Sequence, residues 1–198
     1  MTSTPHIVIL VASTRTTRFA DYPLKWVLEQ TKDNSDFTFE VVDLRDHTLP
    51  FENLEGSAAM APREYVSEDH EALGEIFDHA DGFVVLVNEY NHGYSASLKN
   101  TFDHYFVEWN RKPVAFLGYG NAGGARAIEQ LRQVIDELDM ASVRPTVNIL
   151  GQFVMAIRGG NENVTEVFQP LEVRLTALLN DLHWWATALK TARDADRE

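Results

Sequence analysis

Apolar residues in this chain gather in short continuous runs that polar segments separate. Residues 83–87 (FVVLV), 6–11 (HIVILV) and 113–117 (PVAFL) are too short to form helices alone and are rich in β-branched side chains. Such runs predict strands that are buried on both faces. Residues 38–42 alternate between polar and apolar positions, and residues 142–149 have an extended character. The pattern therefore predicts five strands.

Segments with helical spacing of their apolar residues lie between these runs. They predict helices after residue 18, over 65–79, from Ser95, over 125–138 and over 164–192, the last regular only from near Pro170. Continuously apolar strands that alternate with helices are typical of a parallel sheet covered on both faces. Right-handed crossovers favour the strand order 2-1-3-4-5 for a chain of 198 residues. We therefore predict one α/β domain over residues 1–198, a three-layer sandwich around a five-stranded parallel sheet.

In that strand order, the loops after strands one, three and four meet at one edge of the sheet, where open α/β sheets bind ligands. The first loop, residues 12–18, carries four hydroxyls together with Arg15 and Arg18 at a helix start. This combination suits a terminal phosphate. The alternative is that Ser13 or Thr16 caps the helix and both arginines are solvated. The loop has neither the Walker pattern nor the dinucleotide fingerprint, so transfer of a nucleotide phosphate is not expected.

The second and third loops suit a planar ring. Residues 88–94 combine tyrosines and amides beside Gly93, which lets the turn bend closely. Residues 120–124 contain three glycines, so that backbone amides can approach a ligand. Taken alone, the second loop could equally be a tyrosine pair that covers the sheet end, and the third a tight strand-to-helix turn. Together, the three loops predict a mononucleotide with a large planar base.

Composition narrows the remaining possibilities. A net charge of −13 argues against nucleic-acid and anionic-membrane partners, and it requires a local cluster of donors for any anionic ligand. The chain has no cysteine, and its seven histidines show no shared metal-site spacing. No apolar run approaches the roughly 20 residues that cross a bilayer, and residues 1–5 lack the features of a signal peptide. We expect a soluble cytoplasmic protein without a metal centre.

The motifs at these loops resemble those of the NADPH-dependent FMN reductase family of flavodoxin-like flavoproteins. The family's first-loop pattern is approximately G-S-x-R-x-x-R/S. It is matched by Ser13, Arg15 and Arg18, with Ala12 in place of the glycine. A glycine-rich loop followed by R-A-x-E-Q-L-R is matched by residues 120–124 and 126–132.

The second-loop pattern of the family is P-E-Y-N-x-x-x-P-x-x-L-K-N. Residues 88–100 match every fixed position except the two prolines, which are Asn88 and Ser95 here. Each departure supplies a backbone N–H and removes a fixed φ. The resemblance carries over nearly the whole chain, with three motifs in the family's order.

The resemblance implies a flavodoxin-like fold that binds FMN along the strand ends and accepts electrons from NADPH or NADH. It implies phosphate contacts from the first loop and ring contacts from the other two. The implied cofactor residues are Ser13, Arg15, Arg18, Asn88, Glu89, Tyr90, Asn91, Gly120, Asn121 and Gly123. Hydride chemistry belongs to the flavin itself, so we assign no catalytic side chain.

The implied partners are a small electron acceptor, such as free flavin, a quinone or an azo compound, and a second copy of the chain. In a homodimer or a dimer of dimers, the long connection over residues 45–62 would help to close the neighbour's flavin site. Two alternatives stay open. One is a flavodoxin-type electron carrier without reductase activity, and the other is a flavodoxin-like binding module that has lost FMN.

Overall fold

The computed structural model describes residues 4–51 and 56–196. Its strands form one parallel sheet of order β2-β1-β3-β4-β5. They are β1 (His6–Val11), β2 (Thr38–Asp43), β3 (Gly82–Asn88), β4 (Pro113–Tyr119) and β5 (Ala141–Ile149). Every residue of β3 and β4 is buried, as their continuous apolar sequence predicts. The predicted fold class and strand order are confirmed.

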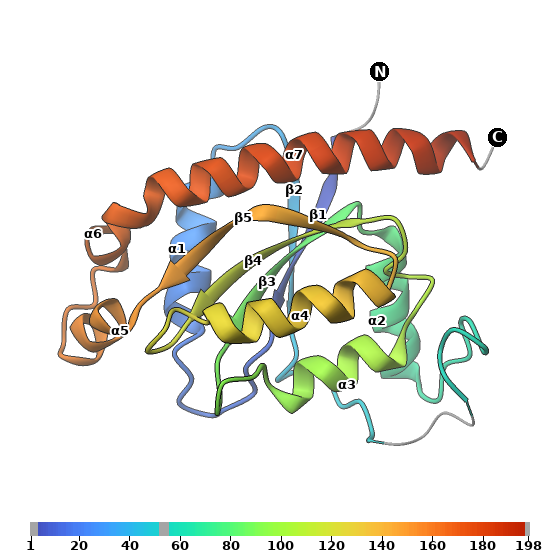
Figure 1. Ribbon diagram of the computed structural model, residues 1–198, viewed down its shortest axis with the longest axis horizontal. Helices are drawn as coiled ribbons and strands as arrows, with labels where there is room; N and C mark the ends of the chain where they lie inside the picture. The colour runs from blue at the N-terminus through green and yellow to red at the C-terminus, as the bar shows by residue number, and fades with distance from the viewer. Residues whose placement is uncertain (1–3, 52–55, 197–198) are drawn as a thin grey trace.

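Helices cover both faces of the sheet (Figure 1). One face packs against α1 (Asp21–Thr31), α6 (Val164–Phe168) and α7 (Glu172–Ala195), and the other against α2 (Glu68–His79), α3 (Ala96–His104) and α4 (Ala125–Glu137). Alternate residues of a strand point to opposite faces, so Ile7 and Ile9 join the first core and Val8 and Leu10 join the second. Two apolar cores therefore hold the three layers together.

The C-terminal third differs from the prediction in one element. The helix α5 (Gly151–Arg158) follows β5 directly, and it was not predicted because only Ile157 of its eight residues is buried. The helix expected over 164–192 is divided into α6, a 3-10 turn at Gln169–Leu171, and α7. Pro170 lies within that turn, so the long regular helix begins just after it, as expected.

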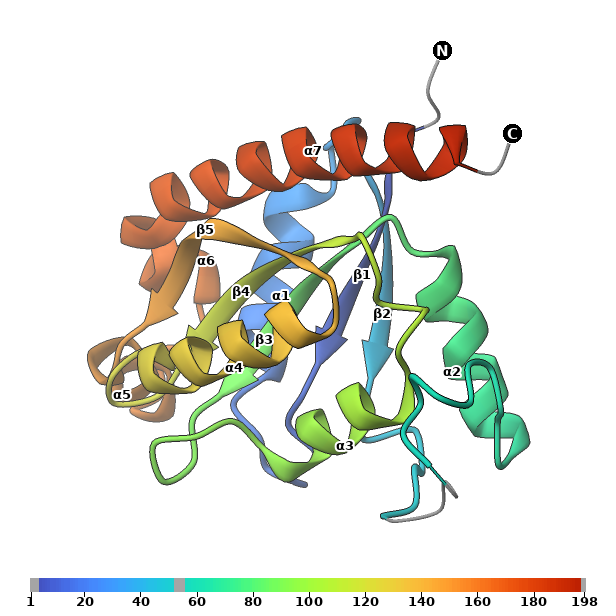
Figure 2. The ribbon, with the colours of Figure 1, turned by 45° about the vertical axis from the view of Figure 1, so that its right-hand side comes forward.

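The carboxyl ends of all strands lie along one edge of the sheet, and α5 lies beside that edge (Figure 2). The loops after β1, β3 and β4 therefore come together, as the strand order predicts. The start of the connection over residues 45–62 approaches the same edge, where Leu49 accepts a hydrogen bond from Asn100 of α3. Residues 52–55 of that connection lie outside the described residues.

Candidate functional site

A cavity of about 340 Å³ lies where the three loops meet, and we call it the strand-end cavity. Its volume falls in the range of small-molecule sites. It is lined by Ser13, Arg15, Thr17, Arg18, Phe19, Asn88, Glu89, Tyr90, Tyr119, Gly120, Asn121, Val154 and Arg158. Eight of the ten predicted cofactor residues belong to this wall, and Asn91 and Gly123 do not.

Arg18 is buried at the base of the first loop, and protein oxygens accept hydrogen bonds from all five of its N–H groups. Its Nε and Nη2 donate to Asp21 Oδ1 at 2.9 and 2.6 Å. Nη1 donates to the Ser13 carbonyl at 2.8 Å, and Nη1 and Nη2 donate to the two carboxylate oxygens of Asp43 at 2.5 Å each. Burial lowers the pKa of Arg18, but the hydrogen bonds to Asp43 and Asp21 outweigh burial and raise it. Arg18 therefore holds the loop in place, in contrast to the phosphate contact we expected.

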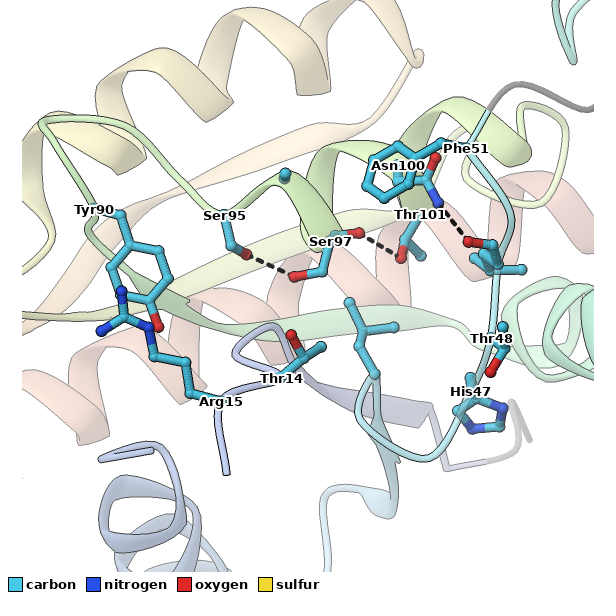
Figure 3. A pocket seen from close by; sticks show the side chains of 13 residues that line it. Thr14, Arg15, His47, Thr48, Phe51, Tyr90, Ser95, Ser97, Asn100 and Thr101 are labelled. Carbon is cyan, nitrogen blue, oxygen red and sulfur yellow. Dashed lines mark hydrogen bonds between the residues drawn. The ribbon is translucent and has the colours of Figure 1, made fainter. Parts of the chain in front are cut away.

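Arg15 has the opposite environment. Its guanidinium lies over the ring of Tyr90, 4.0 Å from the ring centroid, as Figure 3 shows. The hydroxyl of Tyr90 in turn lies 3.1 Å from Ser13 Oγ. Arg15 forms no hydrogen bond or ion pair with any residue that the structure describes. Because a cation–π contact uses the face of the guanidinium, its N–H groups stay available to an anionic ligand.

The second loop turns through a tight hairpin between Tyr90 and Gly93. The N–H of each donates to the carbonyl of the other, at 2.8 and 3.0 Å. The left-handed positions are Asn91 (φ 49°) and His92 (φ 70°), not Gly93. Our expectation that Gly93 provides the bend is therefore wrong. Asparagine adopts the left-handed region more readily than most residues, and Asn91 thereby shapes the turn.

The second loop is fixed to the start of α4. Glu89 Oε1 accepts a hydrogen bond from Arg126 Nε at 2.6 Å. Arg126 Nη1 lies 2.8 Å from His92 Nε2, and Gln130 Nε2 donates to the His92 carbonyl at 3.0 Å. Two residues of the R-A-x-E-Q-L-R motif thus position the neighbouring loop, rather than contacting the cavity themselves.

Several buried polar atoms on the cavity wall have no hydrogen-bond partner among the described residues. They are both side-chain polar atoms of Asn88, Glu89 Oε2 and the hydroxyl of Tyr119. Buried polar groups in folded proteins are nearly always paired. A group of unpaired donors and acceptors on one wall is therefore a feature that a polar ligand would satisfy.

The glycines of the third loop serve two purposes. Gly120 has φ 142° and belongs to the cavity wall. Gly123 has φ 63°, and a Cβ there would lie 2.8 Å from Asn148 Cβ. The carbonyl of Gly123 accepts a hydrogen bond from Asn148 Nδ2 at 2.9 Å. Gly123 is thus required for packing against β5 and does not approach the cavity.

A second cavity of about 490 Å³, which we call the side cavity, shares Arg15 and Tyr90 with the first (Figure 3). Its wall combines residues of the first loop, the connection after β2 and the start of α3. They are Thr14, Arg15, Leu44, His47, Thr48, Leu49, Phe51, Tyr90, Ser95, Ala96, Ser97, Asn100 and Thr101. Arg15 and Tyr90 belong to both walls, so the stacked pair separates two adjacent spaces.

The family model of the NADPH-dependent FMN reductases matches residues 5–154. The chain belongs to this family. A protein of Schizosaccharomyces pombe named NAD(P)H-dependent FMN reductase is 38% identical over 147 residues, which cover 74% of this chain and 73% of the relative. A Saccharomyces cerevisiae protein of the same description is 29% identical over 160 residues, 78% of each chain.

Solved structures share the fold. The flavoenzyme FerB of Paracoccus denitrificans, an NAD(P)H:(acceptor) oxidoreductase, has a TM-score of 0.69 at 19% identity and covers 92% of this chain and 97% of its own. An NADH:FMN oxidoreductase, EMOB, has a TM-score of 0.59 at 19% identity, over 87% of this chain and 90% of its own. At such identities the likeness shows the flavodoxin-like fold alone.

Two kinds of wall residue were not predicted from the sequence. Phe19 and Tyr119 are aromatic residues whose positions in the sequence are typical of the core, and both are buried. Arg158 lies on α5, four residues beyond the region that the FMN reductase family model matches. Within the described part of the chain, Arg158 forms no hydrogen bond or ion pair. An arginine followed by two glycines at a helix end is an ordinary surface pattern, so the sequence carries no signal for this position.

Two of the three departures from the family motifs contact each other. Ala12 does not have a positive φ, so alanine fits in place of the family's glycine. Its carbonyl accepts hydrogen bonds from Ser95 Oγ at 3.2 Å and from Ser97 Oγ at 2.8 Å. Ser95, which replaces the family's second proline, thereby ties the start of α3 to the first loop.

No group of histidine and carboxylate side chains within residues 4–51 and 56–196 has the arrangement of a metal site. In the same residues, no helix is both long and apolar enough to cross a bilayer.

Proposed function

We propose that this member of the FMN reductase family holds FMN in the strand-end cavity and passes electrons from NAD(P)H to a small acceptor. One observation carries the proposal. The cavity has unpaired, buried polar atoms at Asn88, Glu89 and Tyr119, and unpaired cations at Arg15 and Arg158. A planar heteroaromatic ring with a phosphate tail is the ligand that satisfies both groups.

The ring would lie against the second and third loops. Asn88, Glu89 and Tyr90 supply polar groups from the end of β3, and Gly120 and Asn121 supply close backbone from the end of β4. The unpaired atoms of these loops are suited to the carbonyl and N–H groups along the edge of an isoalloxazine. Asn91 and Gly123 would act by shaping their turns, because neither lines the cavity.

The phosphate would lie against the first loop. Ser13 and Thr17 provide hydroxyls, and Arg15 and Arg158 provide guanidinium groups that the protein does not use. Charge-assisted hydrogen bonds from arginine are the strong contacts in phosphate sites. Arg18 would position this loop through Asp21 and Asp43 instead of contacting the phosphate.

FMN held in this cavity would supply the hydride chemistry between NAD(P)H and the acceptor. The protein's part is to bind and orient the ring and to leave one side open. The side cavity shares Arg15 and Tyr90 with the strand-end cavity. It has apolar side chains of Leu44, Leu49 and Phe51 beside hydroxyl groups, which suits a second planar reactant.

The test of the activity is anaerobic mixing of the FMN-loaded protein with NADPH or NADH. We expect the absorbance of oxidised flavin near its visible maximum to disappear rapidly, and to return when a quinone is added. A protein that binds FMN but keeps its colour in excess NAD(P)H would be an electron carrier. A protein that takes up no FMN would be a binding module of this fold.

The phosphate end is tested by comparing FMN with riboflavin, which lacks the phosphate. We expect Arg158→Ala to weaken FMN binding about fivefold to tenfold, in line with an exposed charge-assisted contact, and to leave riboflavin binding unchanged. Arg174→Ala on α7 is the matched control, since it removes the same charge from an exposed position outside the cavity. Equal weakening of both ligands by Arg158→Ala would contradict a phosphate contact.

We further propose a cytoplasmic homodimer. The support is the family resemblance together with the exposed apolar side chains of Phe51 and Met60 on the connection after β2. Light scattering after gel filtration would give twice the monomer mass of 22.4 kDa. A single monomer peak at micromolar concentration would contradict the proposal.

A further inference from the structure

We propose that the side chain of Asn88 is a direct hydrogen-bonding partner of the bound flavin ring, a contact that the proline of the family motif cannot make. The inference rests on the FMN site proposed above. It assigns a role in ligand binding to one of the chain's departures from its family. Three observations about Asn88 carry it.

The first observation is position. Asn88 is the last residue of β3 and is paired in register with Tyr119, the last residue of β4. Both belong to the wall of the strand-end cavity, beside Glu89 and Gly120. Asn88 is thus part of a central strand, and not of a loop, at the point where the ring is proposed to lie.

The second observation is burial without a partner. Asn88 is 1% exposed, yet neither its Nδ2 nor its Oδ1 is hydrogen-bonded to any residue in the described part of the chain. A carboxamide can donate two hydrogen bonds and accept two more. Leaving all of them unmade in a buried position destabilises the protein that has no ligand.

The third observation is contrast with the rest of the interior. Apart from Asn88 and the aromatic side chains, each buried polar or charged residue that the structure describes has at least one side-chain hydrogen bond. These residues are Ser13, Arg18, Thr31, His70, Asp81, Ser95, Thr101, His104, Glu108 and Lys112. Elsewhere in the described part of the chain, Trp26, Trp109, His104 and Thr187 each leave one buried polar atom without a partner, whereas Asn88 leaves two. Among the described residues, the carboxamide of Asn88 is therefore the side chain with the most hydrogen-bonding groups left unpaired.

The chemistry of the ring matches this side chain. The polar edge of an isoalloxazine alternates carbonyl and imine acceptors with one N–H donor, so a ligand of this kind needs both a donor and an acceptor from the protein. Proline at position 88 offers neither from its side chain or its nitrogen, whereas asparagine offers both. The same contact would distinguish a flavin from a planar ring that lacks a polar edge.

Loss of the Asn88 carboxamide should raise the stability of the FMN-free protein and lower its affinity for flavins. Asn88→Leu replaces the carboxamide by an apolar side chain of similar size. Because the buried groups without partners are removed, we expect the FMN-free protein to become more stable, with its thermal midpoint raised by roughly 2–4 °C. Because the ligand contacts are also removed, we expect the dissociation constants of FMN and riboflavin to rise together, about tenfold.

The experiment measures thermal unfolding of the FMN-free protein and fluorescence titration with both flavins. Asn110→Leu is the control, because Asn110 Nδ2 already donates to the carbonyls of Phe106 and Leu138 and lies away from the cavity. We expect this variant to lose stability and to bind both flavins as the unchanged protein does. Asn88→Ala provides a second variant with the same expected weakening, should the leucine be too large for its site.

Each outcome decides between the two proposals. If the unchanged protein binds neither flavin, the proposed FMN site is wrong. If it binds FMN and both Asn88 variants bind FMN and riboflavin equally well, the role of Asn88 is wrong and the FMN site stands. A fall in stability of FMN-free Asn88→Leu, like that of the Asn110 control, would also overturn the inference, since it would show that the carboxamide is satisfied without ligand.

Discussion

The two ends of the same sheet treat their buried polar groups in opposite ways. At the amino end, the carboxylate of Asp81 accepts hydrogen bonds from the His6 backbone at 3.0 Å, from Lys190 Nζ at 3.2 Å and from Arg193 Nη2 at 2.8 Å. At the carboxyl end, the side chain of Asn88 and one oxygen of Glu89 have no partner among the described residues. The carboxylate of Asp81 is therefore occupied within the protein, whereas unpaired polar atoms of Asn88 and Glu89 belong to residues that line a cavity.

This difference separates polar groups that hold the fold from those that bind. The carboxylate of Asp81 joins the start of β1 to the C-terminal part of α7, where Lys190 and Arg193 balance its negative charge. The same contrast exists within the first loop, where Arg18 is fully paired and Arg15 is not. Residue type and motif position are therefore insufficient to assign a ligand contact. A side chain is a candidate for such a contact when its polar groups have no hydrogen-bond partner within the protein.

The largest effect is expected at the amino end. Asp81→Ala leaves Lys190 and Arg193, both mostly buried, without their shared carboxylate. We expect the free energy of unfolding to fall by about 3 kcal/mol, measured by urea unfolding, with FMN affinity of the folded protein unchanged. Asp194→Ala removes an exposed carboxylate from Lys190 and should cost less than about 1 kcal/mol. If Asp81→Ala and Asp194→Ala lowered the free energy of unfolding by similar amounts, Asp81 would not be a residue that holds the amino end of the sheet together.

The next effect concerns a carboxyl-end residue that lies off the cavity wall. Gly123→Ala forces a left-handed alanine and brings its Cβ within 2.8 Å of Asn148. We expect a loss of about 2–3 kcal/mol in the free energy of unfolding. Gly160→Ala has a left-handed φ with no atom within 4 Å, so it measures the backbone cost alone. If Gly123→Ala cost no more than Gly160→Ala, the contact with Asn148 would be relaxed by movement of the loop.

A smaller effect is expected for the unpaired arginine of the first loop. Arg15→Ala should weaken FMN binding about 30-fold, or about 2 kcal/mol, because a charged contact to phosphate is lost. Riboflavin binding should weaken much less, since riboflavin keeps only the ring contacts. Titration with both ligands measures the difference, and urea unfolding should show little change because Arg15 is exposed. A large loss of stability would place Arg15 among the structural residues.

The smallest effect is a dependence of stability on pH through Asp43. Burial raises the pKa of Asp43, but the hydrogen bonds from Arg18 and from the Arg45 backbone outweigh burial and lower it. A carboxyl group with a lowered pKa stabilises the folded state above its unfolded value of roughly 3.9, and this stabilisation is lost as the pH falls through the lower folded value. Urea unfolding of Asp43→Asn should therefore depend less steeply on pH below about 4 than that of the unchanged protein. Parallel curves would show that Asp43 contributes nothing to the acid sensitivity.

The sequence was sufficient for the features that depend on local pattern and chain order. The continuous apolar runs predicted β3 and β4, parallel strands in the order 2-1-3-4-5 brought the three loops to one edge, and three motifs indicated the family. Eight of the ten predicted cofactor residues lie on one cavity as a result.

Features that depend on contacts distant along the chain could not be predicted. Asp43 lies 25 residues after Arg18, and only the register of β1 against β2, which pairs Val11 with Asp43, places that carboxylate beside the first loop. Arg158 comes from α5, whose single buried residue leaves no amphipathic pattern to detect. The side chain of Asn88 has no partner because no described residue around it offers a donor or an acceptor within reach. No pattern in the sequence could show this.

The contact between Ser95 and Ala12 bears on engineering of this protein. Returning a residue to the one most frequent among relatives commonly stabilises a protein, and proline would be that choice at position 95. Here the exchange would remove one of the two hydroxyls that donate to the Ala12 carbonyl and would leave the other, that of Ser97, in place. Proline at position 95 should therefore stabilise this protein less than such exchanges commonly do, because a hydrogen bond between the first loop and the start of α3 is lost.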